Sequence, residues 1–172
     1  MKTILILSLL LFFAFSRSTY ASNDSLISLK QSIEIAEKII EGDIIKAERK
    51  FREKGTFVEI EVLTAKGGRL NLELENKSGA ILSLESKEGP FDYEIFPGDN
   101  IQLLSKMKKM VEENTGDEVL KWKLSPKKDS KWEYEFWTIT KSGKANVRIN
   151  ADSGVIITKP PKKEPKKKKA KD

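Results

Sequence analysis

The sequence predicts an α+β protein built from two tandem units, each a helix packed on a three- to four-stranded antiparallel sheet. Three observations lead to this prediction. A stretch with helical periodicity precedes segments that alternate apolar and polar residues, turns containing Gly separate those segments, and the whole order recurs about 74 positions further on. Chance readily matches one Ser-Gly turn, but it rarely matches a helix, its stop, a Glu-x-Glu strand and a turn in the same order.

Each predicted unit begins with a helix. Residues 28–31 read Ser-Leu-Lys-Gln, a capping-box pattern, and Asp99 with Gln102 is the equivalent cap in the second unit. Gly42 and Gly116 are the predicted helix stops. The predicted apolar faces are Leu29, Ile33, Ala36 and Ile40 in the first helix, and Leu103 or Leu104 with Met107, Met110 and Val111 in the second.

Alternating segments follow each helix and indicate strands with one buried and one solvated face. Gly turns connect them, because Gly readily adopts the positive φ that tight hairpins require. A Ser-Gly turn then leads into a last short apolar run in each unit. The predicted longer strands are residues 44–51, 56–65, 69–75, 118–125, 131–140 and 144–150.

The N-terminus has the features of a secretory signal peptide. Lys2 precedes a twelve-residue stretch at 4–15 that is apolar except for Ser8, shorter than the roughly 20 residues that a spanning helix needs, and Thr-Tyr-Ala follows at 19–21. An uncleaved anchor is the alternative. The predicted segments are a signal peptide at 1–21, a first unit at 22–86, a linker at 87–97, a second unit at 98–158 and a Lys- and Pro-rich tail at 159–172. We therefore expect export to the bacterial periplasm, the cell envelope or the medium.

The net charge of +6 is concentrated in the tail. Residues 159–172 hold eight Lys against two acids, whereas residues 22–158 hold 22 basic and 24 acidic side chains. The tail has no large apolar residue, and we expect it to be disordered. It either binds an anionic envelope surface or only improves solubility, and export disfavours nucleic acid as a partner. The lysines predicted for surface binding are Lys162, Lys163, Lys166, Lys167, Lys168 and Lys169.

Glu75 and Asn150 each stand four residues before a turn Gly that precedes an apolar run. Together with the short helix and the alternating strand, this pattern resembles the PepSY domain family, which prefers Asp at that position. The resemblance implies an exported bacterial protein with a helix packed on an antiparallel sheet. It also implies protease regulation, because PepSY units occur in the propeptides of thermolysin-like zinc proteases. The family motif assigns this role to no particular residue.

The chain contains no His and no Cys, which removes the usual general base and the preferred zinc ligands. The pairs Glu59 with Glu61 and Glu133 with Glu135 each lie on one strand face, where a solvated sheet surface explains them better than acid–base chemistry does. We therefore predict no catalytic residues, no metal and no cofactor.

Trp137 breaks the alternation of its strand. Trp132, Tyr134 and Phe136 are predicted to face the core, which places Trp137 beside Glu133 and Glu135 on the opposite face. Trp137, Glu133 and Glu135 form the predicted partner-binding patch, since Trp is enriched at the centres of protein interfaces. A β-bulge or packing between the units are the alternatives. The linker aromatics Phe91, Tyr93 and Phe96 are expected to cover an exposed sheet edge.

The function predicted from the sequence is that of a non-enzymatic exported binding module that inhibits or regulates an exported protease. The alternative is an envelope-associated structural or adaptor protein held by its basic tail.

Overall fold

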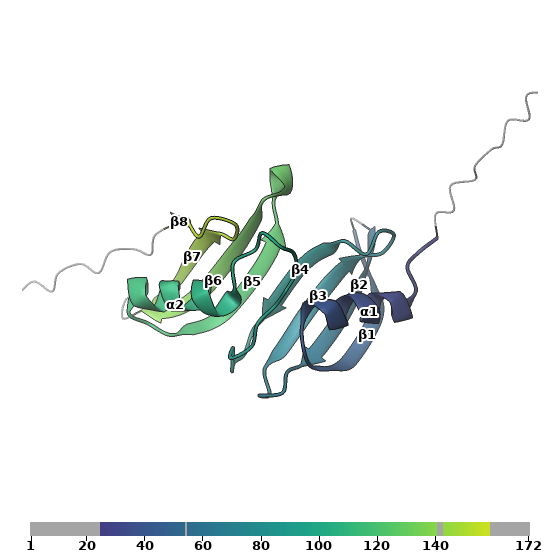
Figure 1. Cartoon of the computed structure of the whole chain (residues 1–172), viewed down its shortest axis with the longest axis horizontal. Coiled ribbons are helices and arrows are strands. Elements are labelled where there is room, and N and C mark those ends of the chain that lie inside the picture. Colours follow the sequence, from purple (N-terminus) through teal and green to yellow (C-terminus); the bar gives the residue numbers. More distant parts are fainter. Residues whose placement is uncertain (1–24, 54, 141–142, 159–172) are drawn as a thin grey trace, which may run out of the picture.

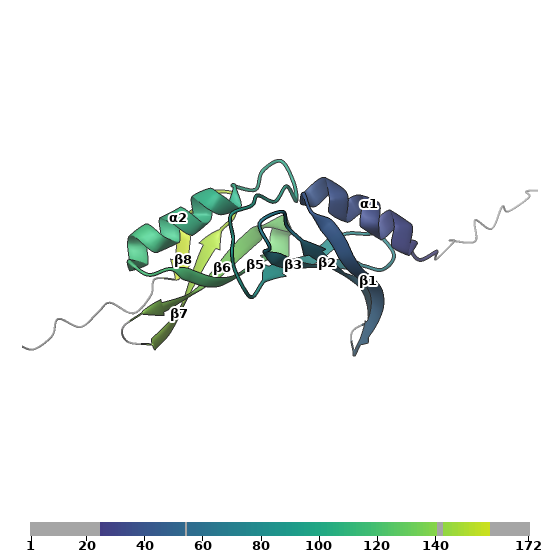
Figure 2. The ribbon, with the colours of Figure 1, turned by 90° about the horizontal axis from the view of Figure 1, so that it is seen from below.

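The alternating segments fold into one eight-stranded antiparallel sheet in which every strand pairs with its neighbour in sequence, and both helices lie on the same face of that sheet (Figures 1 and 2). The computed structural model describes residues 25–53, 55–140 and 143–158, so the predicted signal peptide and tail lie outside the described residues. The elements are α1 (Leu29–Ile39), β1 (Asp43–Arg52), β2 (Gly55–Leu63), β3 (Arg69–Glu75), β4 (Ile81–Ser86), α2 (Leu104–Thr115), β5 (Val119–Pro126), η1 (Lys128–Ser130), β6 (Trp132–Thr140), β7 (Gly143–Asn150) and β8 (Ile156–Thr158).

The predicted division into two units with separate sheets is wrong. Strand β4 pairs with β5 in antiparallel register, with Leu84 opposite Leu124 and Ser86 opposite Trp122. Two separate four-stranded sheets would each leave a free edge here, with unpaired backbone N–H and C=O groups. Joining β4 to β5 satisfies both edges and makes one sheet from the two helix-and-strand series.

Helix α1 begins at the predicted cap. The Ser28 side chain accepts a hydrogen bond from the Gln31 amide, and the Gln31 side chain accepts one from the Ser28 amide. The buried face differs slightly from the prediction, because Ser32, Ala36 and Ile39 are buried whereas Leu29 is exposed. The helix is therefore rotated by a fraction of a turn relative to the face read from the sequence.

Helix α2 is capped differently from the prediction. It begins at Leu104, and the N-cap residue Leu103 makes no side-chain cap. Instead of Asp99 or Gln102, the linker residue Glu94 accepts from the Ser105 amide at 3.3 Å. The carboxylate suits the partial positive charge of a helix N-terminus. The predicted stop is confirmed, since Gly116 adopts the left-handed conformation at φ 69°.

The linker crosses the helix-covered side of the sheet between α1 and α2, and not along a sheet edge (Figure 2). Phe91 is buried in the core, and the Phe96 amide donates to the Ile39 carbonyl at 2.7 Å. Tyr93 Oη accepts from the indole N–H of Trp122 at 3.2 Å. The linker thus helps to cover the joint between β4 and β5.

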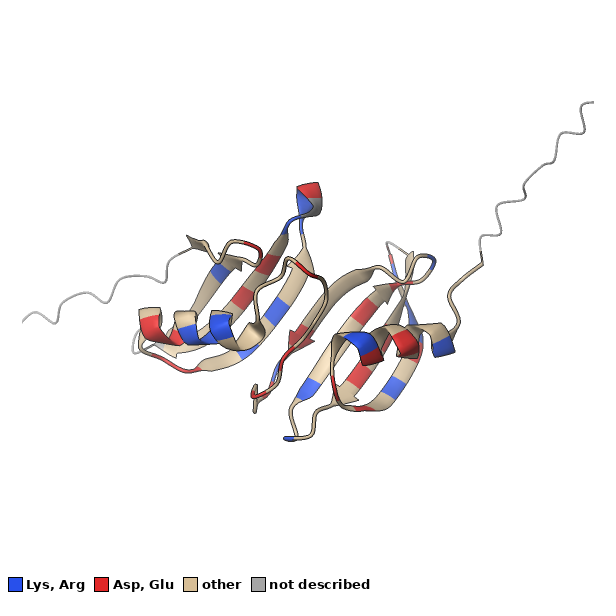
Figure 3. Cartoon of the chain, in the orientation of Figure 1, with Lys and Arg blue, Asp and Glu red and all other residues tan. Residues whose placement is uncertain are grey.

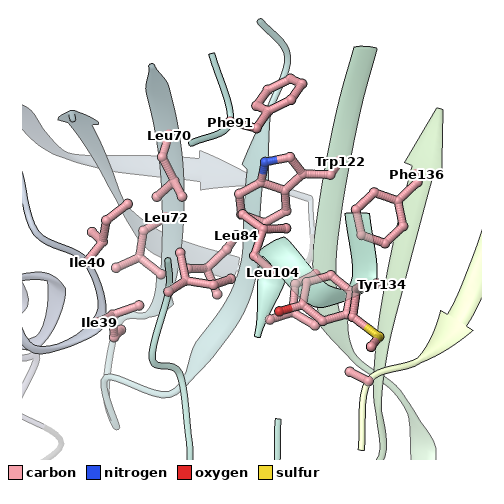
Figure 4. Close-up of a cluster of buried hydrophobic side chains, with 14 of the residues drawn as sticks. Ile39, Ile40, Leu70, Leu72, Leu84, Phe91, Leu104, Trp122, Tyr134 and Phe136 are labelled. Atoms are coloured by element: carbon pink, nitrogen blue, oxygen red, sulfur yellow. The ribbon is translucent and has the colours of Figure 1, made fainter. Parts of the chain in front are cut away.

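A continuous apolar core lies between the helices and the sheet and runs through the joint (Figure 4). Trp122 meets the ring of Tyr134 edge-on, with 6.5 Å between the ring centroids. Tyr134 stacks on Phe136, with 5.5 Å between their ring centroids. The predicted core orientation of Trp132, Tyr134 and Phe136 is confirmed, with the last two fully buried and Trp132 packed against the core. Core side chains labelled in Figure 4 are Ile39, Ile40, Leu70, Leu72, Leu84, Phe91, Leu104, Trp122, Tyr134 and Phe136.

Candidate functional site

The candidate functional site is the face of the sheet that faces away from α1 and α2. In the described part of the chain no helix covers this uncovered face, which arches between the β1–β2 and β6–β7 hairpins (Figure 2). Charged side chains cross it in rows, and they appear as blue and red bands on the strands in Figure 3. One row crosses all eight strands, with six charged residues and with uncharged Asn71 and Thr158 on β3 and β8; its charged members are Lys46, Glu61, Glu85, Lys123, Glu135 and Arg148.

On strands β1 to β3 the charges are paired closely. Lys50 bridges Glu59 and, at 2.9 Å, Glu48, and Arg52 binds both carboxylate oxygens of Glu73 at 2.9 and 2.5 Å. Hydrogen bonds from Lys46 and Lys50 hold the pKa of Glu48 below its ordinary value.

Phe57, the aromatic residue of this part of the face, lies under the Arg52 guanidinium, which is 4.0 Å from the ring centroid. Only 4% of Phe57 is exposed. The Arg52 side chain therefore covers the ring that β2 places on this face.

The predicted patch residues Glu133 and Glu135 lie on this face in β6, but both carboxylates are paired within the molecule. Glu133 is buried and accepts two hydrogen bonds from Arg148 at 2.7 and 2.8 Å. Lys127 lies 3.6 Å from Glu133 and 3.4 Å from Glu135. Burial alone would raise the pKa of Glu133, but Arg148 and Lys127 outweigh it, and the pKa lies below its ordinary value.

The centre of the face is a cluster that sequence reasoning missed. One carboxylate, Glu85 on β4, is shared by Lys87 at 3.1 Å, Lys121 at 3.7 Å and Lys123 at 3.8 Å. Burial tends to raise the pKa of Glu85, but the three ammonium groups lower it overall. Lysines at alternate positions of β5 were visible in the sequence, whereas the pairing of β4 with β5 that brings Glu85 among them was not.

Trp137 lies on the uncovered face, directly opposite Lys121 on β5 and Asn146 on β7. The β-bulge considered for it belongs to β5, where the register shifts between Val119 and Lys121. The Lys121 ammonium lies 4.6 Å from the Trp137 ring centroid, and the ring stays half-buried. The structure thus brings Trp137 beside the lysine cluster as well as onto the face of the two glutamates.

Glu75 and Asn150, the positions that carry the family resemblance, stabilise turns. Glu75 accepts from the amides of Lys77 and Ser78 at 3.0 and 2.6 Å. Asn150 accepts from the Ser153 amide at 2.8 Å in the equivalent hairpin. These bonds hold the pKa of Glu75 below its ordinary value. The Glu75 carboxylate and the Asn150 side-chain amide oxygen accept equivalent hydrogen bonds from the turn backbone. Asn at position 150 therefore still stabilises its turn.

A pocket lies beside the linker, on the side of the sheet that carries the helices, and has a volume of about 370 Å³. Its lining includes Lys66, Tyr93 and Glu94. The buried hydroxyl of Thr64 also lines it and has no hydrogen-bond partner among the residues that the structure describes. The charged side chains around this pocket are of both signs and define no ligand class.

Within residues 25–53, 55–140 and 143–158, no group of three or more His, Cys, Asp or Glu is placed to hold a metal ion. No helix among these residues is both long and apolar enough to cross a bilayer. The predicted tail lysines 162, 163 and 166–169 fall outside the described residues.

Comparisons with known proteins leave the chain unassigned to a family. No family model matches it, and no curated protein matches it in sequence. Among solved structures it is similar to a protein from Clostridium difficile 630 described as a "putative lipoprotein", at 8% identity and a TM-score of 0.35. That match covers 75% of this chain and 86% of the other. A TM-score this low assigns neither a fold nor a function.

Proposed function

We propose that this protein is a non-enzymatic exported binding protein that docks a partner protein on the uncovered face of its sheet. The observation that supports the proposal is the uncovered face itself. It is eight strands wide and arched, and no helix among the described residues covers it. It also presents Trp137 beside rows of charged side chains. Protein interfaces are enriched in Trp, Tyr and Arg near their centres, with charged and polar groups around them.

An exported protease is the partner class to test first, because of the resemblance to PepSY units. The test adds the mature chain, residues 22–172, at micromolar concentration to exported proteases of the source cell and follows peptide hydrolysis. We expect inhibition. An unchanged rate with every protease would count against protease regulation.

A chemical block identifies the face used. The chain has no Cys, so a single cysteine can be placed and modified with maleimide-polyethylene glycol. The modified Asn146→Cys variant carries the polymer beside Trp137, and we expect it to lose inhibition. The matched control is modified Lys109→Cys, at an exposed position of α2, which should inhibit normally. Equal activity of the two would contradict docking on the uncovered face.

Envelope association through the tail is the second candidate function. Residues 159–172 hold eight Lys and two acids, and each basic residue near an anionic surface adds about 1 kcal/mol of attraction. Sedimentation with envelopes at low salt, lost at about 0.5 M salt, would support this tether, because salt screens exposed charges. Unchanged sedimentation after deletion of 159–172 would contradict it.

A further inference from the structure

The part of the uncovered face on strands β4–β7 carries an excess of positive charge that the part on β1–β3 lacks. On strands β1–β3 the face has four basic and five acidic side chains, whereas strands β4–β7 carry four basic and three acidic ones. Lys87 and Lys127, just outside the ends of β4 and β5, add two further basic side chains to the second set. The first set is Lys46, Lys50, Arg52 and Arg69 with Glu48, Glu59, Glu61, Glu73 and Glu75. The second set is Lys87, Lys121, Lys123, Lys127, Lys144 and Arg148 with Glu85, Glu133 and Glu135.

The excess is centred on Glu85. A single carboxylate cannot neutralise three ammonium groups, and the Lys87 side chain is 62% exposed. The lysines are therefore available to further carboxylates without first breaking a one-to-one ion pair.

Apolar surface adjoins these lysines. Trp137 lies under Lys121, and Ile139, two residues further along β6 on the same face, is 55% exposed. We name Lys87, Lys121, Lys123, Trp137 and Ile139 the basic–apolar patch. Its two kinds of side chain call for a ligand that has both negative and apolar groups.

We propose that the basic–apolar patch binds an acidic segment of the partner protein, with its carboxylates against Lys87, Lys121 and Lys123 and an apolar side chain against Trp137 and Ile139. This inference rests on the proposed function and names the partner's chemistry. The arch of the face suits a chain segment better than a flat bilayer, which would meet the rims first (Figure 2). A phosphate polymer offers no group that packs on Trp137.

The test uses a fluorescein-labelled peptide of Glu and Phe of about twelve residues, which is long enough in extended form to cross the patch. The protein is the full mature chain with the eight tail lysines changed to Gln, so that the tail does not compete. Anisotropy gives the dissociation constant. The triple variant Lys87→Gln, Lys121→Gln, Lys123→Gln should bind roughly ten-fold or more weakly, because complementary charge is lost.

The matched control makes the same charge change on the helices, with Lys30→Gln, Lys106→Gln and Lys109→Gln, and should bind as the parent does. Circular dichroism checks the fold of each variant. Equal weakening in both triple variants would overturn the inference, because it would mean that net charge alone attracts the peptide.

Trp137→Ala tests the apolar contact. It should weaken binding of the Glu-Phe peptide and leave binding of a Glu-Gly peptide unchanged. Polyphosphate and phosphatidylglycerol vesicles are the competing ligands. The inference would be overturned if either of them bound as tightly as the Glu-Phe peptide and Trp137→Ala weakened the binding of neither that ligand nor the peptide. The polymer-block experiment is independent of these lysines. If the block abolishes inhibition while the peptide tests fail, the docking face stands and the acidic segment is wrong.

Discussion

The first half of the sheet, β1–β4 with α1, and the second half, β5–β8 with α2, share an order of elements and differ on the uncovered face. Their hairpins before β4 and β8 are closed by Glu75 and Asn150 in the same way. On the uncovered face, Arg52 covers the buried ring of Phe57, whereas Trp137 stays half-buried under Lys121.

This difference distinguishes the residues that maintain the fold from the residues that form the exposed surface of the sheet. Side chains that close turns and fill the core keep their roles in both halves, while the outward residues change from paired charges to an excess of lysine. We therefore expect substitutions in the core to affect both halves together, and substitutions on the uncovered face to affect mainly the second half's interactions.

The largest expected effect comes from Leu72→Ala in the first half. Leu72 is fully buried between Ile60 and Leu84, and its truncation should destabilise the protein by about 2–5 kcal/mol. The three Trp residues all lie in the second half, at 122, 132 and 137. Because β4–β5 pairing joins the halves, the urea midpoint seen by tryptophan fluorescence should fall together with that seen by circular dichroism.

Leu124→Ala is the control in the second half, and it should shift both probes in the same manner. If Leu72→Ala left the fluorescence midpoint unchanged, the two halves would unfold independently. That result would contradict a single cooperative sheet.

Glu133→Gln should destabilise the protein by about 1–2 kcal/mol at neutral pH, because it removes the ion pair with Arg148. The loss is limited to this range because Arg148 is partly exposed and water screens the pair. The pKa of Glu133 is lowered in the folded state. Its ionised form therefore stabilises the fold above the unfolded-state pKa, and this contribution is lost as pH falls through the folded-state pKa. The difference between wild type and Glu133→Gln should accordingly shrink in acid.

The matched variant in the first half is Glu59→Gln. The Glu59 side chain is more exposed than that of Glu133, 18% against 6%, and Lys50 is its ion-pair partner. We expect a smaller loss of stability. Chemical denaturation of both variants across the acidic range measures the two effects, and a pH-independent loss for Glu133→Gln would contradict the ion-pair account.

The two turn glycines should respond unequally to alanine. Gly79 and Gly154 have φ of 73° and 74°, so alanine at either costs about 1 kcal/mol of backbone strain. At Gly79 the added Cβ would also lie 2.7 Å from Ile35 Cδ1, whereas at Gly154 its nearest neighbour is Met110 Cε at 3.5 Å. Thermal unfolding should therefore show the larger loss for Gly79→Ala, and equal losses would mean that Ile35 moves aside freely.

Trp137→Phe should change stability least, by less than about 0.5 kcal/mol, because the residue lies on the surface of the sheet. It should nevertheless remove part of the acrylamide-quenchable emission. Trp122 is fully buried and serves as the internal reference. Quenching that is unchanged by Trp137→Phe would show a shielded ring and would remove the apolar side of the proposed patch.

Local features of this fold were predictable from sequence because they depend on neighbouring residues. The alternation located the strands, Ser28 and Gln31 located the start of α1, and Gly116 located the end of α2. Predictions failed where a distant segment decides the outcome. Glu94 replaces the expected cap of α2.

The assembly of the sheet was unpredictable for the same reason. The pairing of Leu84 with Leu124 turns two expected sheets into one, and no local pattern specifies it. The candidate face was half-predictable: alternation placed Trp137 beside Glu133 and Glu135, but the cluster around Glu85 exists only because β4 meets β5.

The pairing of β4 with β5 is the claim on which the uncovered face depends, and cross-strand nuclear Overhauser effects test it directly. We predict contacts between the residues opposite one another in this pair, Leu84 with Leu124 and Ser86 with Trp122. A spectrum with contacts between β3 and β4 and between β5 and β6, but with none between β4 and β5, would contradict the continuous sheet and the binding face built on it.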